Sequence, residues 1–154
     1  MNKTVFFTIL LVFTTIVMSS CEKNDYADWK LLNEQWWENN KEALKNEGFQ
    51  TTESGLMYKI IDPGEQRHPS YNSYILVTYT GSLIDGSTFD KSEKYPFSMN
   101  GMIKGWIEGL RKIQNGGIIQ LYMPHTLGYG TAGSGSIPPY SVLKFEIQLL
   151  QSDY

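Results

Sequence analysis

Alternation of apolar and polar residues recurs along the chain from residue 55 onward, and it constrains the fold more than any other feature. Four stretches carry it: GLMYKII (55–61), YILVTYTG (74–81), IIQLYMP (118–124) and LKFEIQLL (143–150). Side chains alternate between the two faces of a β-strand, so each stretch predicts a strand with one face on the core. The residues expected on these apolar faces are Leu56, Tyr58, Ile60, Ile75, Val77, Tyr79, Ile119, Leu121, Met123, Leu143, Phe145, Ile147 and Leu149.

One segment in the middle of the chain has a different period. In GMIKGWIEGLRKI (101–113) the apolar residues fall on one arc at about 100° per residue, which predicts an amphipathic helix. The arc consists of Met102, Ile103, Trp106, Ile107, Leu110 and Ile113. An interior glycine costs a helix roughly 1 kcal/mol, so Gly105 and Gly109 are expected to permit close approach of neighbouring backbone.

Short turns join the strands around this helix. DPG at 62–64 and DG at 85–86 are signals for tight turns, and the second leads into STFD (87–90). Strands linked by short turns, with one helix between them, predict an α+β fold. We expect a mostly antiparallel sheet whose apolar face packs on the helix.

The first 20 residues have the pattern of an export signal. A basic residue, Lys3, precedes an uncharged and mostly apolar run from Val5 to Met18, which is too short for a comfortable membrane span. The segment 1–20 is therefore interpreted as a signal peptide outside the fold.

Cys21, the only cysteine, lies where that signal would be cleaved. A lone cysteine in an exported protein has no internal disulfide partner. The residues 18–21 resemble the lipobox of bacterial lipoproteins, which implies lipid attachment at Cys21 and a membrane anchor in the cell envelope, periplasm-facing or on the outer membrane. The alternative is an ordinary secreted protein with an unused thiol.

Segment 21–52 is expected to be the lipidated N-terminus followed by a polar helix over 24–47. Trp29, Leu32 and Trp36 recur there at helical spacing, and Gly48 is a usual helix stop. The helix is interpreted as a spacer packed on the domain 53–154, with a dimerisation or partner-binding surface as the alternative.

Several functions are disfavoured by the sequence. Without residues 1–20 the chain has 12 basic and 16 acidic residues and a net charge of about −4, which is unfavourable for binding nucleic acid. GYGTAG (128–133) fits a dinucleotide-binding pattern, but no helix and strand unit follows it. His68 and His125 lack metal-ligand spacing and are expected to be solvated at the surface.

Aromatic residues gather at strand ends and loops, and their pattern alone leaves two interpretations open. They could form the core, or they could line a concave apolar pocket for a small ligand. Asp90, beside the hairpin, is by itself most simply a turn or cap residue. The aromatic residues concerned are Tyr79, Phe89, Phe97, Trp106, Tyr129 and Phe145.

The order of the motifs resembles that of FKBP-type peptidyl-prolyl cis-trans isomerases, and most of all their bacterial envelope members related to the macrophage infectivity potentiators. The similarity covers about residues 53–150. It rests on the succession SGLMYKII, VTYTGSLIDGSTFD, PFSM, MIKGWIEGL, GYG, IPPY and LKFEIQLL. It implies a twisted, mostly antiparallel sheet half-wrapped around one short central helix, and it implies an isomerase of X-Pro bonds in exported polypeptides.

The resemblance also implies roles for single residues. The residues implied in catalysis are Asp90, Tyr129, Tyr79, Phe89 and Trp106, and those implied in substrate binding are Phe97, Met102, Ile103, Ile137 and Phe145. Trp106 would be the floor under the substrate proline ring, Ile103 would offer its backbone N–H, and Tyr129 its hydroxyl. Rotation about an amide breaks no bond, so neither a cofactor nor a metal is expected.

The family implies proline-containing polypeptides as partners, with macrolides of the tacrolimus or rapamycin type as further ligands of the same pocket. A non-catalytic chaperone or proline-peptide-binding lipoprotein that uses this cleft is the alternative function. A purely structural lipoprotein would give no reason for the set of pocket residues.

Overall fold

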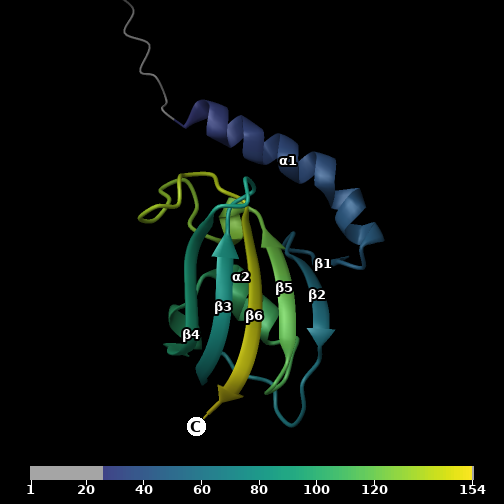
Figure 1. Cartoon of the computed structure of the whole chain (residues 1–154), viewed down its shortest axis with the longest axis vertical. Coiled ribbons are helices and arrows are strands. Elements are labelled where there is room, and N and C mark those ends of the chain that lie inside the picture. Colours follow the sequence, from purple (N-terminus) through teal and green to yellow (C-terminus); the bar gives the residue numbers. More distant parts are fainter. Residues whose placement is uncertain (1–25, 154) are drawn as a thin grey trace, which may run out of the picture.

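The fold is a single six-stranded antiparallel sheet with one helix inside its curve and another across one end (Figure 1). We describe residues 26–153 of a computed structural model, so the expected signal peptide (1–20) and Cys21 lie outside the described residues. The strand order is β1-β2-β5-β6-β3-β4, and every neighbouring pair is antiparallel. The expected α+β class is confirmed.

The secondary structure elements follow the predicted order. The strands are β1 Gln50–Thr51, β2 Met57–Asp62, β3 Tyr74–Ser82, β4 Thr88–Ser98, β5 Ile118–Met123 and β6 Leu143–Ser152. The helices are α1 Ala27–Asn46 and α2 Lys104–Leu110, with short 3-10 turns η1 Met99–Gly101 and η2 His125–Leu127. None of the helices within residues 26–153 is long and apolar enough to cross a membrane.

The predicted apolar faces of β3, β5 and β6 form the core. Every residue expected on those three faces is at most 8% exposed. Burial of their apolar area, at about 25 cal/mol per Å², is the main force that holds the sheet onto α2. Ile60 on β2 is an exception, because it is 39% exposed. The β2–β5 register slips between Ile60 and Asp62, and this irregularity ends the alternation there.

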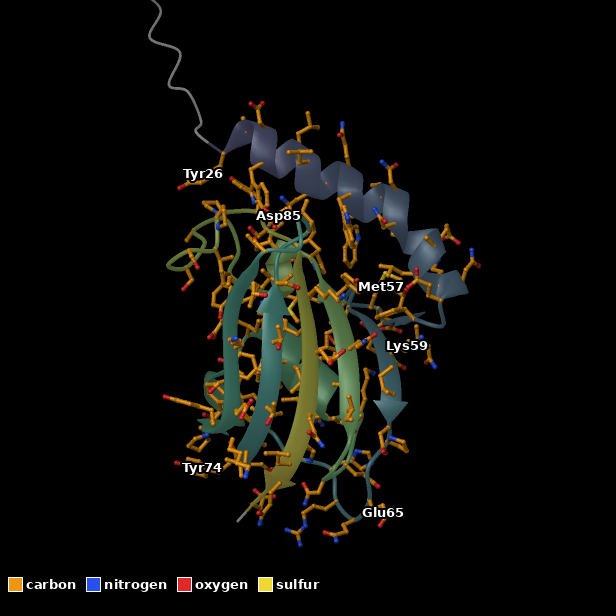
Figure 2. The ribbon with its side chains drawn as sticks, viewed as in Figure 1. Tyr26, Met57, Lys59, Glu65, Tyr74 and Asp85 are labelled. Atoms are coloured by element: carbon orange, nitrogen blue, oxygen red, sulfur yellow. The ribbon has the colours of Figure 1, made fainter. Side chains whose placement is uncertain are left out.

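A second, smaller apolar cluster joins α1 to the sheet. Met57, expected on the solvent side of its strand, is buried there with Leu44 and Phe49. Figure 2 shows Met57 below the C-terminal half of α1. Trp36 of α1 stacks on Tyr122 of β5 with 5.5 Å between ring centroids. The opposite face of the sheet is therefore partly covered by α1.

Helix α2 is shorter than the predicted span of 101–113, but its glycines have the expected kind of role. A Cβ on Gly105 would lie 2.5 Å from Met123 Sδ, and one on Gly109 would lie 2.7 Å from Leu121 Cδ2. The glycines thus let α2 lie directly on β5. The close neighbours are side chains of β5, whereas we expected backbone.

Candidate active site

Trp106 lies at the centre of an aromatic cluster built from one helix and three strands. Its side chain is 2% exposed. The rings of Tyr79 (β3), Phe145 (β6) and Phe97 (β4) lie 5.0, 5.2 and 5.8 Å from it, at interplanar angles of 82°, 89° and 75°. The three rings stand nearly perpendicular to the indole, the edge-to-face arrangement that aromatic quadrupoles favour. The geometry is that of a flat base with upright walls.

A cavity of about 260 Å³ lies within this aromatic cluster. It brings together eight of the ten residues that the resemblance singled out. Gly101, which the sequence analysis treated only as the start of a helix, also lines it and has open space where a Cβ would stand. The lining residues are Tyr79, Asp90, Phe97, Gly101, Met102, Ile103, Trp106, Tyr129 and Phe145.

Phe89 and Ile137 lie outside the residues that line this cavity. Phe89 packs edge-on against Phe145, with 5.5 Å between the ring centroids. The two rings meet over Gly81, where a Cβ would lie 2.6 Å from Phe89 and 2.7 Å from Phe145. Ile137 is 7% exposed and belongs to the main core. Phe89 lines a neighbouring hollow together with Asp90, whereas Ile137 is buried in the core.

The cavity carries one acidic group at its rim. Asp90 Oδ2 accepts a 2.6 Å hydrogen bond from the Tyr79 hydroxyl. Burial, followed by this hydrogen bond and the carboxylate charge, raises the pKa of Tyr79 well above its ordinary value. The Tyr79 phenol therefore stays protonated at neutral pH and keeps donating to Asp90.

Tyr129 brings a second phenol to the cavity from the loop between η2 and β6. It is 37% exposed. Burial and the nearby charge of Asp90 raise the pKa of Tyr129, so its hydroxyl is also a neutral donor. The backbone of this loop is held by hydrogen bonds from Gly133 N to Tyr129 O and from Tyr140 N to Gly130 O, at 3.2 and 3.0 Å.

Ile103 adds backbone polarity at the start of α2. Its φ of −61° and ψ of 150° are extended, and its carbonyl accepts hydrogen bonds from Trp106 N and Ile107 N. Its own N–H donates to no group within residues 26–153. Such free N–H groups are normal in the first turn of a helix, and this one is next to the cavity.

Helix α1 packs on the domain, as expected of a spacer, and it also holds the far end of the Tyr129 loop through polar contacts that we did not predict. Asn33 is 1% exposed, and its Oδ1 accepts a 2.7 Å hydrogen bond from the backbone N–H of Val142. The Trp29 indole donates to Ser141 Oγ at 2.9 Å. A polar residue in a polar helix carries no sequence signal for this contact.

His125 does not have the solvated position that we expected for it. Its ring packs edge-on against Tyr140 at 5.3 Å, and its Nδ1 is buried without a hydrogen-bond partner in the described part of the chain. The expectation is wrong because His125 is half-buried and lines the hollow between α1 and residues 124–142. His68 is exposed as expected and lies 3.2 Å from the Gln114 side chain.

Other hollows in the described residues have larger volumes but less suitable linings. Two of them, of about 400 and 330 Å³, lie along residues 88–91 and between residues 78–80 and 91–93. Two more lie elsewhere. One of about 510 Å³ lies between the turn at 62–66 and residues 115–116 and 150–151, and its lining is mostly polar. Another of about 350 Å³ separates α1 from residues 124–142. Within residues 26–153, none of these four hollows combines upright aromatic rings with two phenols and a carboxylate, as the smaller cavity around Trp106 does. We therefore take the cavity around Trp106 as the candidate active site.

Comparison with known proteins identifies the family of the chain. Residues 65–150 match the family described as FKBP-type peptidyl-prolyl cis-trans isomerase. The FKBP-type 22 kDa peptidyl-prolyl cis-trans isomerase of Escherichia coli (strain K12) is 45% identical over 116 residues, which cover 72% of this chain and 56% of that protein. FkpA of the same strain is 37% identical over 148 residues, covering 92% and 54%. The chain thus spans little more than half the length of these curated relatives.

Solved structures give the same similarity in three dimensions. A crystal structure of FkpA from Escherichia coli has a TM-score of 0.76 and 38% identity, covering 84% of this chain and 61% of that one. A peptidyl-prolyl cis-trans isomerase from Pseudomonas syringae has a TM-score of 0.68 and 28% identity, covering 79% and 96%.

Proposed function

The chain belongs to the FKBP-type peptidyl-prolyl cis-trans isomerase family, and we propose that it accelerates cis-trans isomerisation of X-Pro bonds in polypeptides. The observation that carries the proposal is the cavity around Trp106, with three upright rings and two neutral phenols. A proline ring is compact and apolar, and a small apolar cavity of this kind suits it.

The chemistry required is rotation about one amide bond. Its barrier is about 18 to 20 kcal/mol, because twisting the bond removes the resonance that keeps it planar. An enzyme lowers that barrier by binding the twisted amide better than the planar one. An apolar cavity disfavours the charge-separated planar form. A reduction of about 5 kcal/mol would accelerate rotation several thousandfold.

We assign roles on this basis. Trp106 forms the floor, and Tyr79, Phe97, Met102 and Phe145 form the walls. The Ile103 N–H and the Tyr129 hydroxyl donate to carbonyls on either side of the proline.

Asp90 accepts the hydrogen bond of the Tyr79 hydroxyl and so fixes the orientation of that phenol. Phe89 supports the wall formed by Phe145, against which its ring packs edge-on. Ile137 belongs to the core cluster that also contains Tyr79, Trp106 and Phe145, and we assign it a positioning role there.

A refolding assay tests the proposed activity. The chain beginning at residue 22 is added to an unrelated protein whose slow refolding phase is limited by proline isomerisation. We expect the slow phase to accelerate in proportion to enzyme concentration. A folded sample that binds the unfolded protein without accelerating it would favour the chaperone alternative, and a sample that does neither would reject both functions.

We also propose export and anchoring, which rest on the sequence alone. Residues 1–20 are the signal peptide, Cys21 carries the lipid, segment 21–52 joins the anchor to the domain 53–154, and the enzyme works on exported proteins in the envelope. Mass spectrometry of the protein from envelope fractions tests this. An unmodified Cys21 thiol would reject the anchor and leave the isomerase proposal intact.

Macrolide binding is a further proposal for the same cavity. Titration of tacrolimus or rapamycin, followed by tryptophan fluorescence and by inhibition of refolding catalysis, tests it. Inhibition at one macrolide molecule per chain would support it. Unchanged catalysis at the highest concentration at which the macrolide is soluble would reject it.

A further inference from the structure

The Tyr129 phenol reaches the cavity around Trp106 without a hydrogen bond of its own. Its side chain makes none within residues 26–153, whereas the Tyr79 phenol donates to Asp90. The pairing of β3 with β4 fixes Tyr79 and Asp90. Tyr129 lies on a loop, so the backbone of that loop determines where its hydroxyl points.

The residue after Tyr129 is fixed from both sides. Gly130 N donates to His125 O at 2.8 Å, and Gly130 O accepts a hydrogen bond from Tyr140 N at 3.0 Å. The rings of His125 and Tyr140 in turn pack edge-on, with 5.3 Å between their centroids. The two segments that hold the backbone beside Tyr129 therefore support each other, and a shift of Tyr140 would move Tyr129.

Tyr140 has a backbone conformation that needs support from its surroundings. Its φ is +65°, in the left-handed region that residues with a Cβ rarely adopt. Such a conformation persists only where neighbouring structure holds it. Lys30 of α1 lies over the Tyr140 ring, with its Nζ 5.1 Å from the ring centroid. Part of the support for Tyr140 thus comes from α1.

Two hydrogen bonds from α1 fix the residues that follow. The Trp29 indole donates to Ser141 Oγ at 2.9 Å, and Val142 N donates to Asn33 Oδ1 at 2.7 Å. The Asn33 amide is itself oriented, because its Nδ2 donates to Trp29 O. Asn33, Ser141 and Val142 are at most 4% exposed, so water does not replace these bonds when they are lost. Figure 1 shows the loop, in yellow-green, beside the N-terminal half of α1.

We propose that Trp29 and Asn33 are positioning residues of the active site. By fixing residues 140–142 they hold the Tyr129 hydroxyl where it meets a carbonyl of the substrate. This inference rests on the proposed isomerase function and deepens it, because it makes α1 part of the catalytic unit. A misplacement of about 1 Å by a change far from the chemistry can slow a reaction strongly. Loss of the two bonds should therefore lower turnover even in a folded chain.

The test removes both hydrogen bonds in two backgrounds. In the chain beginning at residue 22, Trp29→Phe/Asn33→Ala removes one donor and one acceptor and leaves an aromatic ring at 29. We expect kcat/KM for a proline peptide to fall about three- to tenfold where Tyr129 is present, mainly in kcat, and less than about twofold in Tyr129→Phe. A role in stability alone lowers the amount of folded chain equally in both backgrounds. Equal losses would therefore overturn the proposal.

Trp36 provides a matched control on the same helix. It anchors α1 by stacking on Tyr122 of β5 and not on the Tyr129 loop. Trp36→Ala therefore weakens the docking of α1 but leaves the bonds to residues 141–142 in place. We expect it to keep kcat/KM within about twofold. A loss as large as that of the double variant would show that docking of the whole helix, and not its two hydrogen bonds, sets activity, and would contradict the proposal.

Failure of this inference and failure of the isomerase function are separable. If the folded wild-type chain accelerates no peptide, the isomerase proposal fails, and amide hydrogen exchange then decides whether α1 positions Tyr129. The informative amides are those of Tyr140 and Gly133, which donate to Gly130 O and Tyr129 O. In Trp29→Phe/Asn33→Ala they should exchange about three- to tenfold faster relative to amides of β3 and β6. Unchanged relative exchange would reject the positioning role.

Discussion

The Tyr79 hydroxyl donates a 2.6 Å hydrogen bond to Asp90 Oδ2 across the β3–β4 pair, at the edge of the cavity around Trp106. Gly81, two residues after Tyr79, pairs directly with Asp90 in the sheet. The two side chains therefore start from adjacent strands, and the sheet itself fixes their separation. A hydrogen bond to a charged acceptor contributes about 1.5 to 3 kcal/mol.

We expect Tyr79→Phe and Asp90→Ala to have overlapping effects on kcat/KM. Each should lower it by about ten- to 150-fold, and the double variant should be little worse than either single one, because both remove the same hydrogen bond. The measurement is a double-mutant cycle on peptide isomerisation. Fully additive losses would show that Asp90 acts on the substrate independently of Tyr79.

The two phenols also predict a pH dependence of stability. The pKa of Tyr79 is raised above the ordinary value of 10.0 by burial and by Asp90. A folded-state pKa above the unfolded one gives stability that is fully present below pH 10 and is lost as pH rises toward the folded value. Urea denaturation between pH 7 and pH 11 should show a loss only above pH 10, smaller in Tyr79→Phe. A loss beginning near pH 8 would contradict this assignment.

Asn33 should matter for stability although it lies in the polar helix α1. Asn33→Ala leaves the buried N–H of Val142 without its partner, at a cost of about 1 to 3 kcal/mol. Asn40 is the matched control. The side-chain amides of Asn33 and Asn40 each donate to the carbonyl four residues earlier, Trp29 O and Trp36 O, but Asn40 has no hydrogen bond to the sheet within the described residues. Asn40→Ala should change the free energy of unfolding far less. Equal losses would show that Asn33 is not a link between α1 and the Tyr129 loop.

A methyl group on Gly109 should destabilise the fold. Alanine favours an isolated helix over glycine by about 1 kcal/mol, but here its Cβ would lie 2.7 Å from Leu121 in the closed core. Overpacking costs about 1 to 3 kcal/mol, so we expect a net loss in chemical denaturation. Gly101→Ala is the control, because that position has open space. Higher stability of Gly109→Ala would mean that α2 has room to move away from β5.

The sequence predicted well those strands in which apolar and polar residues alternate, because this pattern can be recognised in each strand by itself. The faces of β3 and β6 follow from alternation, because alternate side chains of each strand are buried in the main core. Of the ten residues that the family resemblance named, eight line the cavity around Trp106, and Phe89 and Ile137 do not. Periodicity alone left Trp106 equally acceptable as core, and its 2% exposure shows that it is packed in the core as well as lining the cavity.

Features that depend on a partner segment could not be predicted. Strand β4 has one extra residue between the partners of Val77 and Tyr79, a bulge at Lys94 that is visible only in the pairing with β3. The contact of Asn33 with Val142 joins residues 109 positions apart. Phe89 gave an aromatic signal like that of Phe97, but its packing over Gly81 depends on the meeting of three strands.

The most direct measurement is equilibrium exchange of a proline peptide between its cis and trans forms, followed by NMR with and without the chain. The double variant Asp90→Ala/Tyr129→Phe is the comparison, because both residues are partly solvent-accessible and their loss should leave the core folded. We expect the wild-type chain to accelerate exchange at substoichiometric concentration, and the double variant to be at least about tenfold slower. Exchange at the uncatalysed rate in the presence of folded wild-type chain would contradict the proposed function.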